Sequence, residues 1–388
     1  MKIFKIIITL FLLSSLAIAQ QTNYVNIGIM SEFPITSVWI SASQGSYFIY
    51  ADNNKIHTIN GKGSIHVSKV GDSLLVKTNG EVLATCKKVK LVGKDAPNSF
   101  NIKCLQPALP ERTYDDNLEI RPNGKGMKLI NRVNIDHYVA GVVEAENGIG
   151  QNFEYYKTKA IICRTYALSN LKRHEPDGYQ LCDKVHCQVY KGKNKRNDDI
   201  LMAAVATTGI VIVDSNIKLI TAAFHSNCGG QTMNSEDVWS LPTTYLKSVK
   251  DTFCTNMPHA RWETTITKKD WLTYLTLKNK CDLTDTLHTD CYTNYEQPFR
   301  ESDLIIHDLK IPFKKLRTDF NLRSGYFSLE EKGDSIKIIG RGFGHGLGLC
   351  QEGAMRMSEL GYKYNQILHF YYKDIHLVDL SVLDFFKD

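Results

Sequence analysis

The sequence predicts an α+β fold of two parts: a small antiparallel β domain, then a larger domain that mixes helices and strands without strict alternation. Residues 23–104 contain short segments rich in β-branched and aromatic residues, separated by Asn-Asn and Asn-Gly turns, which is typical of antiparallel strands. Longer segments with apolar residues at helical spacing follow, of which 153–173 contains neither Gly nor Pro. With 388 residues, 43% of them hydrophobic, the chain can bury a core, and global disorder is excluded.

The N-terminus has the parts of a secretory signal peptide. Lys2 and Lys5 precede a mostly apolar run over 6–16, and Ala-Ile-Ala at 17–19 is a cleavage site of the A-x-A type. The run is shorter than the roughly 20 residues that a membrane-spanning helix needs. We therefore expect residues 1–19 to be removed and the mature chain to be secreted, as a periplasmic or cell-wall-associated protein without a transmembrane segment.

Residues 20–110 form the predicted β-rich domain. Its strands are expected at 25–29, 47–50, 64–67 and 74–77. Pro107, Pro110 and the polar stretch after them mark the junction to the second domain, 111–388.

The second domain opens with a hairpin, whose strands at 118–120 and 128–130 flank an Asn-Gly turn. The apolar pattern then predicts the following elements in order: helices over 135–143, 153–173 and 200–207, strands over 210–213 and 220–225, a helix over 268–277, a loop over 281–294, a strand over 336–339, and helices over 351–360 and 364–372.

The charge balance is mildly basic. Lysine and arginine exceed aspartate and glutamate by 47 − 41, a net charge of +6, which fits an anionic polymer as partner without requiring one. The basic cluster at 191–196 is short, so we expect no nucleic-acid partner.

The ten cysteines belong to a chain that we expect in an oxidising compartment, where disulfides are the default. Pairs close in the sequence, Cys86 with Cys104 and Cys281 with Cys291, are plausible, although the sequence alone does not fix the connectivity.

Two carboxylates, Glu144 and Glu146, stand near the end of a predicted helix, just before Gly148. Residues two apart do not share a helix face, so at most one of them can point into a given cleft. A carboxyl group beside apolar side chains is a suitable general acid near neutral pH, because burial disfavours its charged form. On spacing alone, two solvated surface glutamates are the alternative.

Two later stretches combine glycine with polar side chains. Residues 340–348 hold five glycines around His345, which permits close approach of the backbone but matches neither a phosphate-binding nor a dinucleotide-binding loop. His345 is a candidate donor to substrate, with a structural histidine as the alternative. Residues 223–232 form a polar loop, and Trp239 beyond it offers a flat face for a sugar, with an ordinary packed tryptophan as the alternative.

Four soft or borderline ligands, His174, Cys182, His186 and Cys187, lie within one short irregular stretch. They could hold a tetrahedral Zn²⁺ ion, although their spacing is not that of a standard zinc finger. A Cys182–Cys187 disulfide is the alternative, which the expected compartment favours.

Taken together, these stretches resemble the SpoIID/LytB family. Residues 136–168 read DHYVAGVVEAENGIGQNFEYYKTKAIICRTYAL, which resembles the family's D-Y-L-x-G-V-V-x-x-E-M-P and A-L-K-A-Q-A-x-x-x-R-T-Y-A segments. FHSNCGGQTMNSEDVW resembles its H-S-x-x-G-G-x-T and E-x-x-W segment, and GRGFGHGLGLCQEGAMRM resembles its G-R-G-x-G-H-G-x-G-x-x-Q-x-G-A segment. The motifs follow the family's order and span about 118–377.

The resemblance implies a mixed helical and β catalytic domain of the SpoIID type that acts on peptidoglycan. SpoIID-type proteins are lytic transglycosylases that cut stem-peptide-free glycan strands, whereas LytB-type relatives enhance N-acetylmuramoyl-L-alanine amidases. The motif places the family's catalytic glutamate on Glu146. The residues expected to line the substrate cleft are Arg164, His225, Ser226, His345 and Gln351, with Trp239 beside them.

The resemblance also bears on the metal. Some members of the family hold zinc with two cysteines and two histidines, including an adjacent His-Cys pair, which favours zinc at His174, Cys182, His186 and Cys187. Four protein ligands leave no open coordination position, so this zinc is expected to be structural.

The chain departs from the family pattern at several positions. Asn147 and Gly148 replace Met-Pro, Lys159 replaces a common Gln, and Cys350 and Glu352 flank the glutamine of the last motif. Gly148 loosens backbone that proline would fix, so a non-catalytic glycan-binding enhancer of an amidase is the second hypothesis. A zinc hydrolase, which would need an open metal position, is the third.

Overall fold

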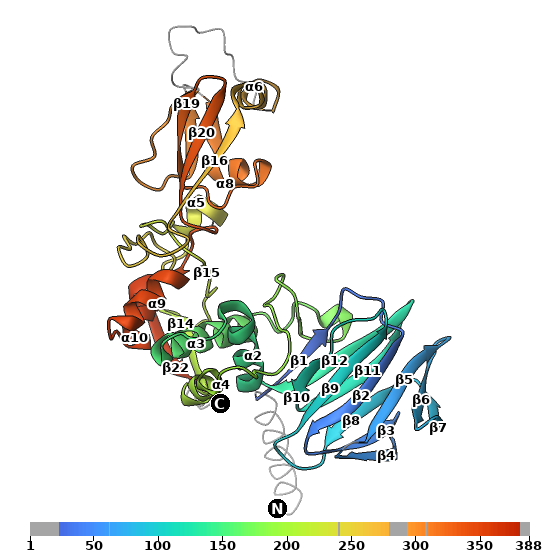
Figure 1. The fold of residues 1–388 in the computed structure, drawn as a ribbon. Helices are drawn as coiled ribbons and strands as arrows, with labels where there is room; N and C mark the ends of the chain where they lie inside the picture. Colours follow the sequence, from blue (N-terminus) through green and yellow to red (C-terminus); the bar gives the residue numbers. More distant parts are fainter. Residues whose placement is uncertain (1–22, 62, 240, 279–292, 307–308, 381–388) are drawn as a thin grey trace, which may run out of the picture. The chain divides into compact units, whose positions relative to one another are not determined.

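A computed structural model describes residues 23–61, 63–239, 241–278, 293–306 and 309–380 (Figure 1). The fold is α+β, as predicted, with a small antiparallel sheet domain at the N-terminus. The predicted signal peptide and the predicted Cys281–Cys291 pair lie outside the described residues.

The chain divides into two compact units. The first comprises 1–150 and 159–208, and the second comprises 151–158 and 209–388. The predicted boundary at residue 110 does not coincide with this division, because strands after it pair with strands before it in one sheet.

Two sheets form the β part of the first unit. Their strand orders are β13-β1-β12-β11-β8-β3-β4 and β10-β9-β2-β5-β6-β7, and neighbours are antiparallel except for β1 and β13. The strands are β1 (Tyr24–Ile29), β2 (Ser37–Gln44), β3 (Ser46–Ala51), β4 (Asn54–Asn60), β5 (Ser64–Val70), β6 (Ser73–Thr78), β7 (Glu81–Cys86), β8 (Val89–Gly93), β9 (Ser99–Gln106), β10 (Arg112–Asp115), β11 (Asn117–Asn123), β12 (Gly126–Asn134) and β13 (Leu181–Cys182). Tyr47 of β3 and Phe100 of β9 meet edge to face with their ring centroids 6.1 Å apart, so the two sheets share a core.

The predicted strands and hairpin are confirmed as β1, β3, β5, β6 and the β11–β12 pair. The predicted Cys86–Cys104 disulfide is wrong, because the structure has both as buried free thiols with different neighbours. The Cys86 sulfur lies 4.0 Å from the Leu74 carbonyl oxygen, and the Cys104 sulfur lies 3.2 Å from the Met30 sulfur.

The helical elements of this part of the chain are α2 (Ile135–Asn147), α3 (Phe153–Ser169), the 3₁₀ turn η1 (Glu175–Asp177) and α4 (Asp198–Ala206), and the division between the units passes through α3. Helix α2 begins after Asn134, whose side chain accepts a hydrogen bond from the Asp136 N–H at 2.8 Å. It ends at Gly148, which has a φ of 67°. The helix is one turn longer than predicted and therefore includes both glutamates of the motif.

The second unit contains three small sheets, which pair β14 with β22, β15 with β21, and β16 with β20 and β19, together with the β17–β18 hairpin. Its strands are β14 (Ile210–Asp214), β15 (Phe224–His225), β16 (Arg261–Thr267), β17 (Asp303–Ile306), β18 (Leu309–Pro312), β19 (Phe327–Lys332), β20 (Ser335–Arg341), β21 (Leu349–Cys350) and β22 (Ile375–Asp379). Its helices are α5 (Ser235–Trp239), α6 (Lys268–Thr273), the π-helical η2 (Tyr274–Lys278), α8 (Phe313–Asp319), α9 (Gln351–Glu359) and α10 (Tyr364–Tyr371).

An apolar cluster around Trp262, Trp271, Phe313 and Phe327 fills the space between the β16-β20-β19 sheet, α6 and α8. The predicted strand over 220–225 is reduced to β15, which pairs in parallel with β21 and so joins the two glycine-bearing motif stretches. Among the described residues, none of the helices combines the length and the apolar character that crossing a membrane requires.

Candidate functional site

The two glutamates of α2 have different surroundings. The carboxylate of Glu144 accepts hydrogen bonds from Asn194 Nδ2 at 2.9 Å and from the backbone N–H of Arg196 at 2.8 Å. It therefore holds the loop that follows Tyr190 and has little capacity left for another partner. The expectation that only one of the two carboxylates points into a given cleft stays a prediction.

Glu146 is the glutamate without such donors. Its side chain is 15% exposed, and its Oε2 is buried without a hydrogen-bond partner among the described residues. The nearest cation is the fully buried Lys159, whose Nζ lies 3.7 Å from Oε2. Burial raises the pKa of the neighbouring Cys163 thiol to about 12, with Lys159 opposing and Glu146 adding to the shift. Glu146 is thus a largely buried carboxylate with one cationic neighbour and one oxygen that has no hydrogen bond in the described part of the chain.

Arg164 does not have the role expected from the sequence. It is fully buried, its Nη2 donates to Asp136 Oδ1 at 2.6 Å and to the Ala204 carbonyl at 2.8 Å, and its Nε donates to Asp136 Oδ1 at 3.2 Å. Asp136 Oδ2 in turn accepts the Thr208 hydroxyl at 2.6 Å. The guanidinium joins α2, α3 and the end of α4, so a glycan cannot reach it, and the prediction of Arg164 as a substrate-binding residue is corrected.

Three other predicted substrate residues come together in the second unit. The rings of His225 and His345 have centroids 5.5 Å apart, and those of Trp239 and His345 are 6.4 Å apart. Trp239 is 39% exposed, so it is not a packed core residue. His345 and Trp239 line a cavity of about 190 Å³, together with Arg300 and Arg317. The sequence analysis missed both arginines, because no motif marks them.

The two histidines are neutral at neutral pH. Burial, with the charges of Arg300 and Arg317, lowers the pKa of His345 to about 4. Burial and the neighbouring His345 lower the pKa of His225 well below its usual value. His225 Nδ1 lies 3.0 Å from the Leu347 carbonyl and donates to it, so Nε2 is the acceptor, and this atom is buried without a partner in the described part of the chain.

Ser226 and Gln351 are not placed in this cavity. The Ser226 carbonyl accepts the Glu352 N–H at 3.0 Å, and Gln351 is the first residue of α9. The two residues therefore lie at the start of α9, and their expected role in binding substrate stays a prediction.

The glycines of 340–348 allow the close approach that the sequence predicted. Gly346 has a φ of 84°, and a Cβ there would lie 2.3 Å from the Arg300 guanidinium carbon. A Cβ on Gly344, where φ is 112°, would lie 2.8 Å from the His225 side chain. These glycines let the backbone pack directly on Arg300 and His225, which positions both beside the cavity.

The four predicted metal ligands of the first unit converge. His174, Cys182, His186 and Cys187 each offer one ligand atom, and these atoms all lie within 4.8 Å of one another. Both thiols are free, and each sulfur lies 3.8 Å from His186 Nδ1.

The second coordination shell also fits a metal. His174 Nδ1 lies 2.8 Å from Asp177 Oδ2, and its Nε2 is buried without a hydrogen-bond partner among the residues described. A carboxylate that orients one ring nitrogen while the other is left for an ion is the usual environment of a histidine ligand. This group of cysteines and histidines could therefore hold a metal ion, and the alternative, a Cys182–Cys187 disulfide, is not formed, because both thiols are free.

Strand β1 contacts residues 174–187, the segment that carries these four candidate ligands and is called the metal-binding loop below. β13 pairs with β1 through Ile27 with Leu181 and Gly28 with Cys182. Gly28 leaves room for the ring of Tyr179, since a Cβ would lie 2.6 Å from it, and that ring stacks on His174 with centroids 5.1 Å apart.

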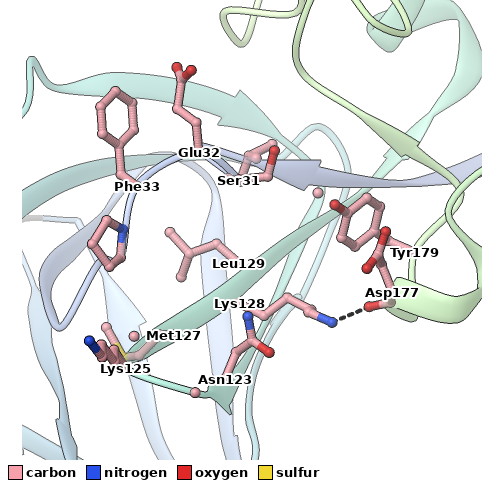
Figure 2. Close-up of a pocket in the computed structure, with 15 residues that line it drawn as sticks. Ser31, Glu32, Phe33, Asn123, Lys125, Met127, Lys128, Leu129, Asp177 and Tyr179 are labelled. Carbon is pink, nitrogen blue, oxygen red and sulfur yellow. Dashed lines mark hydrogen bonds between the residues drawn. The ribbon is translucent and has the colours of Figure 1, made fainter.

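Next to this loop lies a cavity of about 440 Å³ that the sequence did not predict (Figure 2). Figure 2 shows Lys128 extended toward the carbonyl oxygen of Asp177, to which it donates a hydrogen bond, with Tyr179 beside them. A broader cavity of about 790 Å³ lies on the seven-stranded sheet and includes Glu119 and Arg121. Glu146 lines none of these three cavities of the described chain.

Comparison with known proteins adds to this picture. The model of the family described as SpoIID, stage II sporulation protein, matches residues 123–213, which include α2, α3 and the metal-binding loop. An uncharacterized protein of Brachyspira hyodysenteriae is 28% identical over 279 residues, covering 69% of this chain and 73% of the relative. The stage II sporulation protein D of Bacillus subtilis is 28% identical over 258 residues, covering 63% and 74%. An amidase enhancer of Bacillus subtilis is 26% identical over 289 residues, which are 60% of this chain but only 39% of that protein.

Proposed function

Since this chain belongs to the SpoIID/LytB family, we propose that it is a secreted lytic transglycosylase that cleaves peptidoglycan glycan strands, with Glu146 as its single acid and base. The substrate would be strands free of stem peptides, cut between N-acetylmuramic acid and N-acetylglucosamine. The relatives support a role at the cell wall, and the reaction itself is our inference.

The observation that carries the proposal is the contrast between the two glutamates of α2. Glu144 is saturated by the donors of the 194–196 loop, whereas Glu146 keeps a buried oxygen without a hydrogen bond. An oxygen without a hydrogen bond is available to the glycosidic oxygen of a substrate, which is the contact that a general acid has to make.

One carboxyl group is enough for the lytic reaction. A hydrolytic glycosidase needs a second carboxylate, because water or the enzyme must attack the sugar. In the lytic reaction the C6 hydroxyl of the same N-acetylmuramic acid attacks C1, while protonated Glu146 donates its proton to the leaving oxygen of the glycosidic bond. The carboxylate so formed then takes the proton of the C6 hydroxyl, which leaves a 1,6-anhydro end and restores the acid.

We propose that the cavity at Trp239 and His345 holds a saccharide unit of the strand. Trp239 offers an exposed ring face for a sugar, and Arg317 offers a charge for the acidic group of N-acetylmuramic acid. This part of the proposal is independent of Glu146, and Trp239→Ala should weaken the retention of the protein on stem-peptide-free glycan in a sedimentation assay.

We further propose that His174, Cys182, His186 and Cys187 bind a structural zinc ion. The donor set of two thiols and two imidazoles suits zinc, and with four protein ligands no position remains for a reacting water. A bound ion would crosslink residues 174–187, while Asp177 orients His174.

The test is digestion of amidase-treated peptidoglycan by the wild type, Glu146→Gln and the matched control Glu144→Gln. We expect Glu146→Gln to release anhydro products about 10²- to 10⁴-fold more slowly, because the acid is lost. Glu144→Gln should stay within a few-fold of the wild type, since a glutamine oxygen can still accept the Arg196 N–H. Equal rates for wild type and Glu146→Gln would overturn the assignment.

The second candidate is a glycan-binding enhancer of an N-acetylmuramoyl-L-alanine amidase. Two observations favour it: the similarity to an amidase enhancer, and the Asn147-Gly148 sequence, which leaves the end of α2 without the rigidity of proline. No products from any of the three proteins, with glycan still bound and a partner amidase accelerated, would support this function. Products heavier by one water than anhydro ends would instead indicate hydrolysis.

A further inference from the structure

A second group of metal-ligand side chains lies in the second unit. Cys228, Asp251, Cys254 and Cys350 each offer one ligand atom, and these four atoms all lie within 4.8 Å of one another. All four residues have 0% exposure. They come from three separate segments: the polar loop after β15, the stretch before β16 and the residue that precedes α9.

The spacing of the atoms suits one small ion. The Cys228 sulfur lies 3.3 Å from the Cys254 sulfur and 3.3 Å from Asp251 Oδ2. Zinc–sulfur bonds of about 2.3 Å at tetrahedral angles separate two sulfur ligands by roughly 3.8 Å. The thiols therefore need to move apart by only a few tenths of an ångström to accept an ion between them.

The carboxylate of Asp251 is held in place from outside the cluster. Its Oδ2 accepts the Tyr371 hydroxyl at 2.8 Å, and its Oδ1 accepts the Phe253 N–H at 2.9 Å. Gly353 makes this possible, because a Cβ there would lie 2.1 Å from the Tyr371 oxygen and 2.3 Å from Asp251 Oδ2. Partners that fix a ligating carboxylate in this way are typical of metal sites.

Two backbone N–H groups donate to the sulfur of Cys350. It accepts the backbone N–H of Cys228 at 3.3 Å and that of Gly353 at 3.4 Å. Cys350 is also the N-cap of the nine-residue helix α9, whose positive end favours negative charge. Cys350 is one of the positions where the chain departs from the family pattern, so this feature is not explained by the peptidoglycan reaction.

We propose that Cys228, Asp251, Cys254 and Cys350 bind a second structural zinc ion. Three soft thiolates and one carboxylate in a closed, dry, four-ligand arrangement match zinc better than the harder divalent cations. A disulfide would use only two of the three thiols and leave the third, with a buried carboxylate, in the same space. Binding releases the thiol protons and replaces them with one shared cation.

A zinc ion at this site would stabilise the two segments that carry the histidines of the proposed saccharide cavity. Cys228 follows His225 by three residues, and Cys350 pairs with His225 across β15 and β21. The ion would join the polar loop to the glycine-rich stretch that carries His345. The proposal itself does not depend on the transglycosylase reaction.

The test measures zinc per chain by elemental analysis in the full-length mature protein purified without chelator. Cys254→Ser should contain one zinc equivalent less than the parent protein, and His186→Ala should independently lose the other. The matched control is Cys104→Ala, a buried thiol outside both groups, which should leave the zinc content unchanged. An unchanged zinc content in Cys254→Ser would overturn the proposal.

A second measurement needs no variant. The wild type is denatured without reductant, alkylated and mapped by mass spectrometry. Alkylation of Cys228, Cys254 and Cys350 in a protein that carries the zinc is the expected result. The proposal would be contradicted if two of the three cysteines were joined by a disulfide. It would also be contradicted if all three cysteines were alkylated in a protein that carries no zinc at this site.

Discussion

The buried ion pair between Asp136 and Arg164 gives the sharpest stability prediction. Asp136→Ala removes the acceptor of two guanidinium hydrogen bonds and of the Thr208 hydroxyl. Arg164 has 0% exposure, so its charge would stay buried after it loses its hydrogen bonds to the Asp136 carboxylate. Breaking a buried pair by removing one partner costs about 3–5 kcal/mol.

The assay is urea unfolding of the full chain, followed by a probe of the first unit such as amide exchange in α2. Asn134→Ala is the matched control, because it removes only the N-cap hydrogen bond of the same helix, which is worth about 1 kcal/mol. We expect Asp136→Ala to lower the free energy of unfolding at least two-fold more than the control. A loss no larger than that of Asn134→Ala would refute the structural role of Arg164 and reopen its role in substrate binding.

Three further predictions concern the cavity and the metal-binding loop. The pKa of His345 is lowered from 6.5 to about 4, so its contribution to stability is present above pH 6.5 and is lost as the pH falls toward 4. His345→Gln should therefore lose less melting temperature than the wild type between pH 6.5 and pH 4. The same fall in melting temperature in both proteins would contradict this. Gly346→Ala should lower the free energy of unfolding by about 3 kcal/mol, since its Cβ would meet Arg300 and its φ is positive. Gly333→Ala, where the space is open and φ is 59°, should lower it by about 1 kcal/mol. Equal losses would show that the Arg300 side chain can move away from the added methyl group. A chelator or His186→Ala should speed amide exchange over residues 174–187, and unchanged exchange would argue against a metal there.

Much of the fold could be predicted from the sequence, because hydrophobic periodicity is a local property. The strands of the β-rich domain and helices α2 and α3 follow from spacing and turns. The division of the chain into units was harder to predict from the sequence, because the pairing of β11 with β8 is a long-range contact that no local pattern indicates. The prolines near residue 110 mark a connection within one unit.

Residue types and spacing indicated Glu144 and Glu146, His345, Trp239 and the four candidate metal ligands. The resemblance to the SpoIID/LytB family then selected Glu146 over Glu144 and favoured zinc over a disulfide. Arg164 was misassigned, because a motif does not say whether its arginine faces solvent or a buried aspartate. Arg300 was missed, since its position beside the cavity depends on Gly346 packing against it, far away in the sequence.

The pairing of β1 with β13 makes the N-terminal strand a physical part of the metal-binding loop. The Gln180 N–H donates to the Asn26 carbonyl at 2.9 Å, and the Met30 N–H donates to Asp183 Oδ2 at 2.6 Å, on either side of Cys182, one of the candidate ligands. A truncated chain that starts after residue 110 would keep every sequence motif yet lose the template on which this loop is ordered. We therefore expect a fragment without β1 to lose the order of this loop, because β13 would have no strand to pair with.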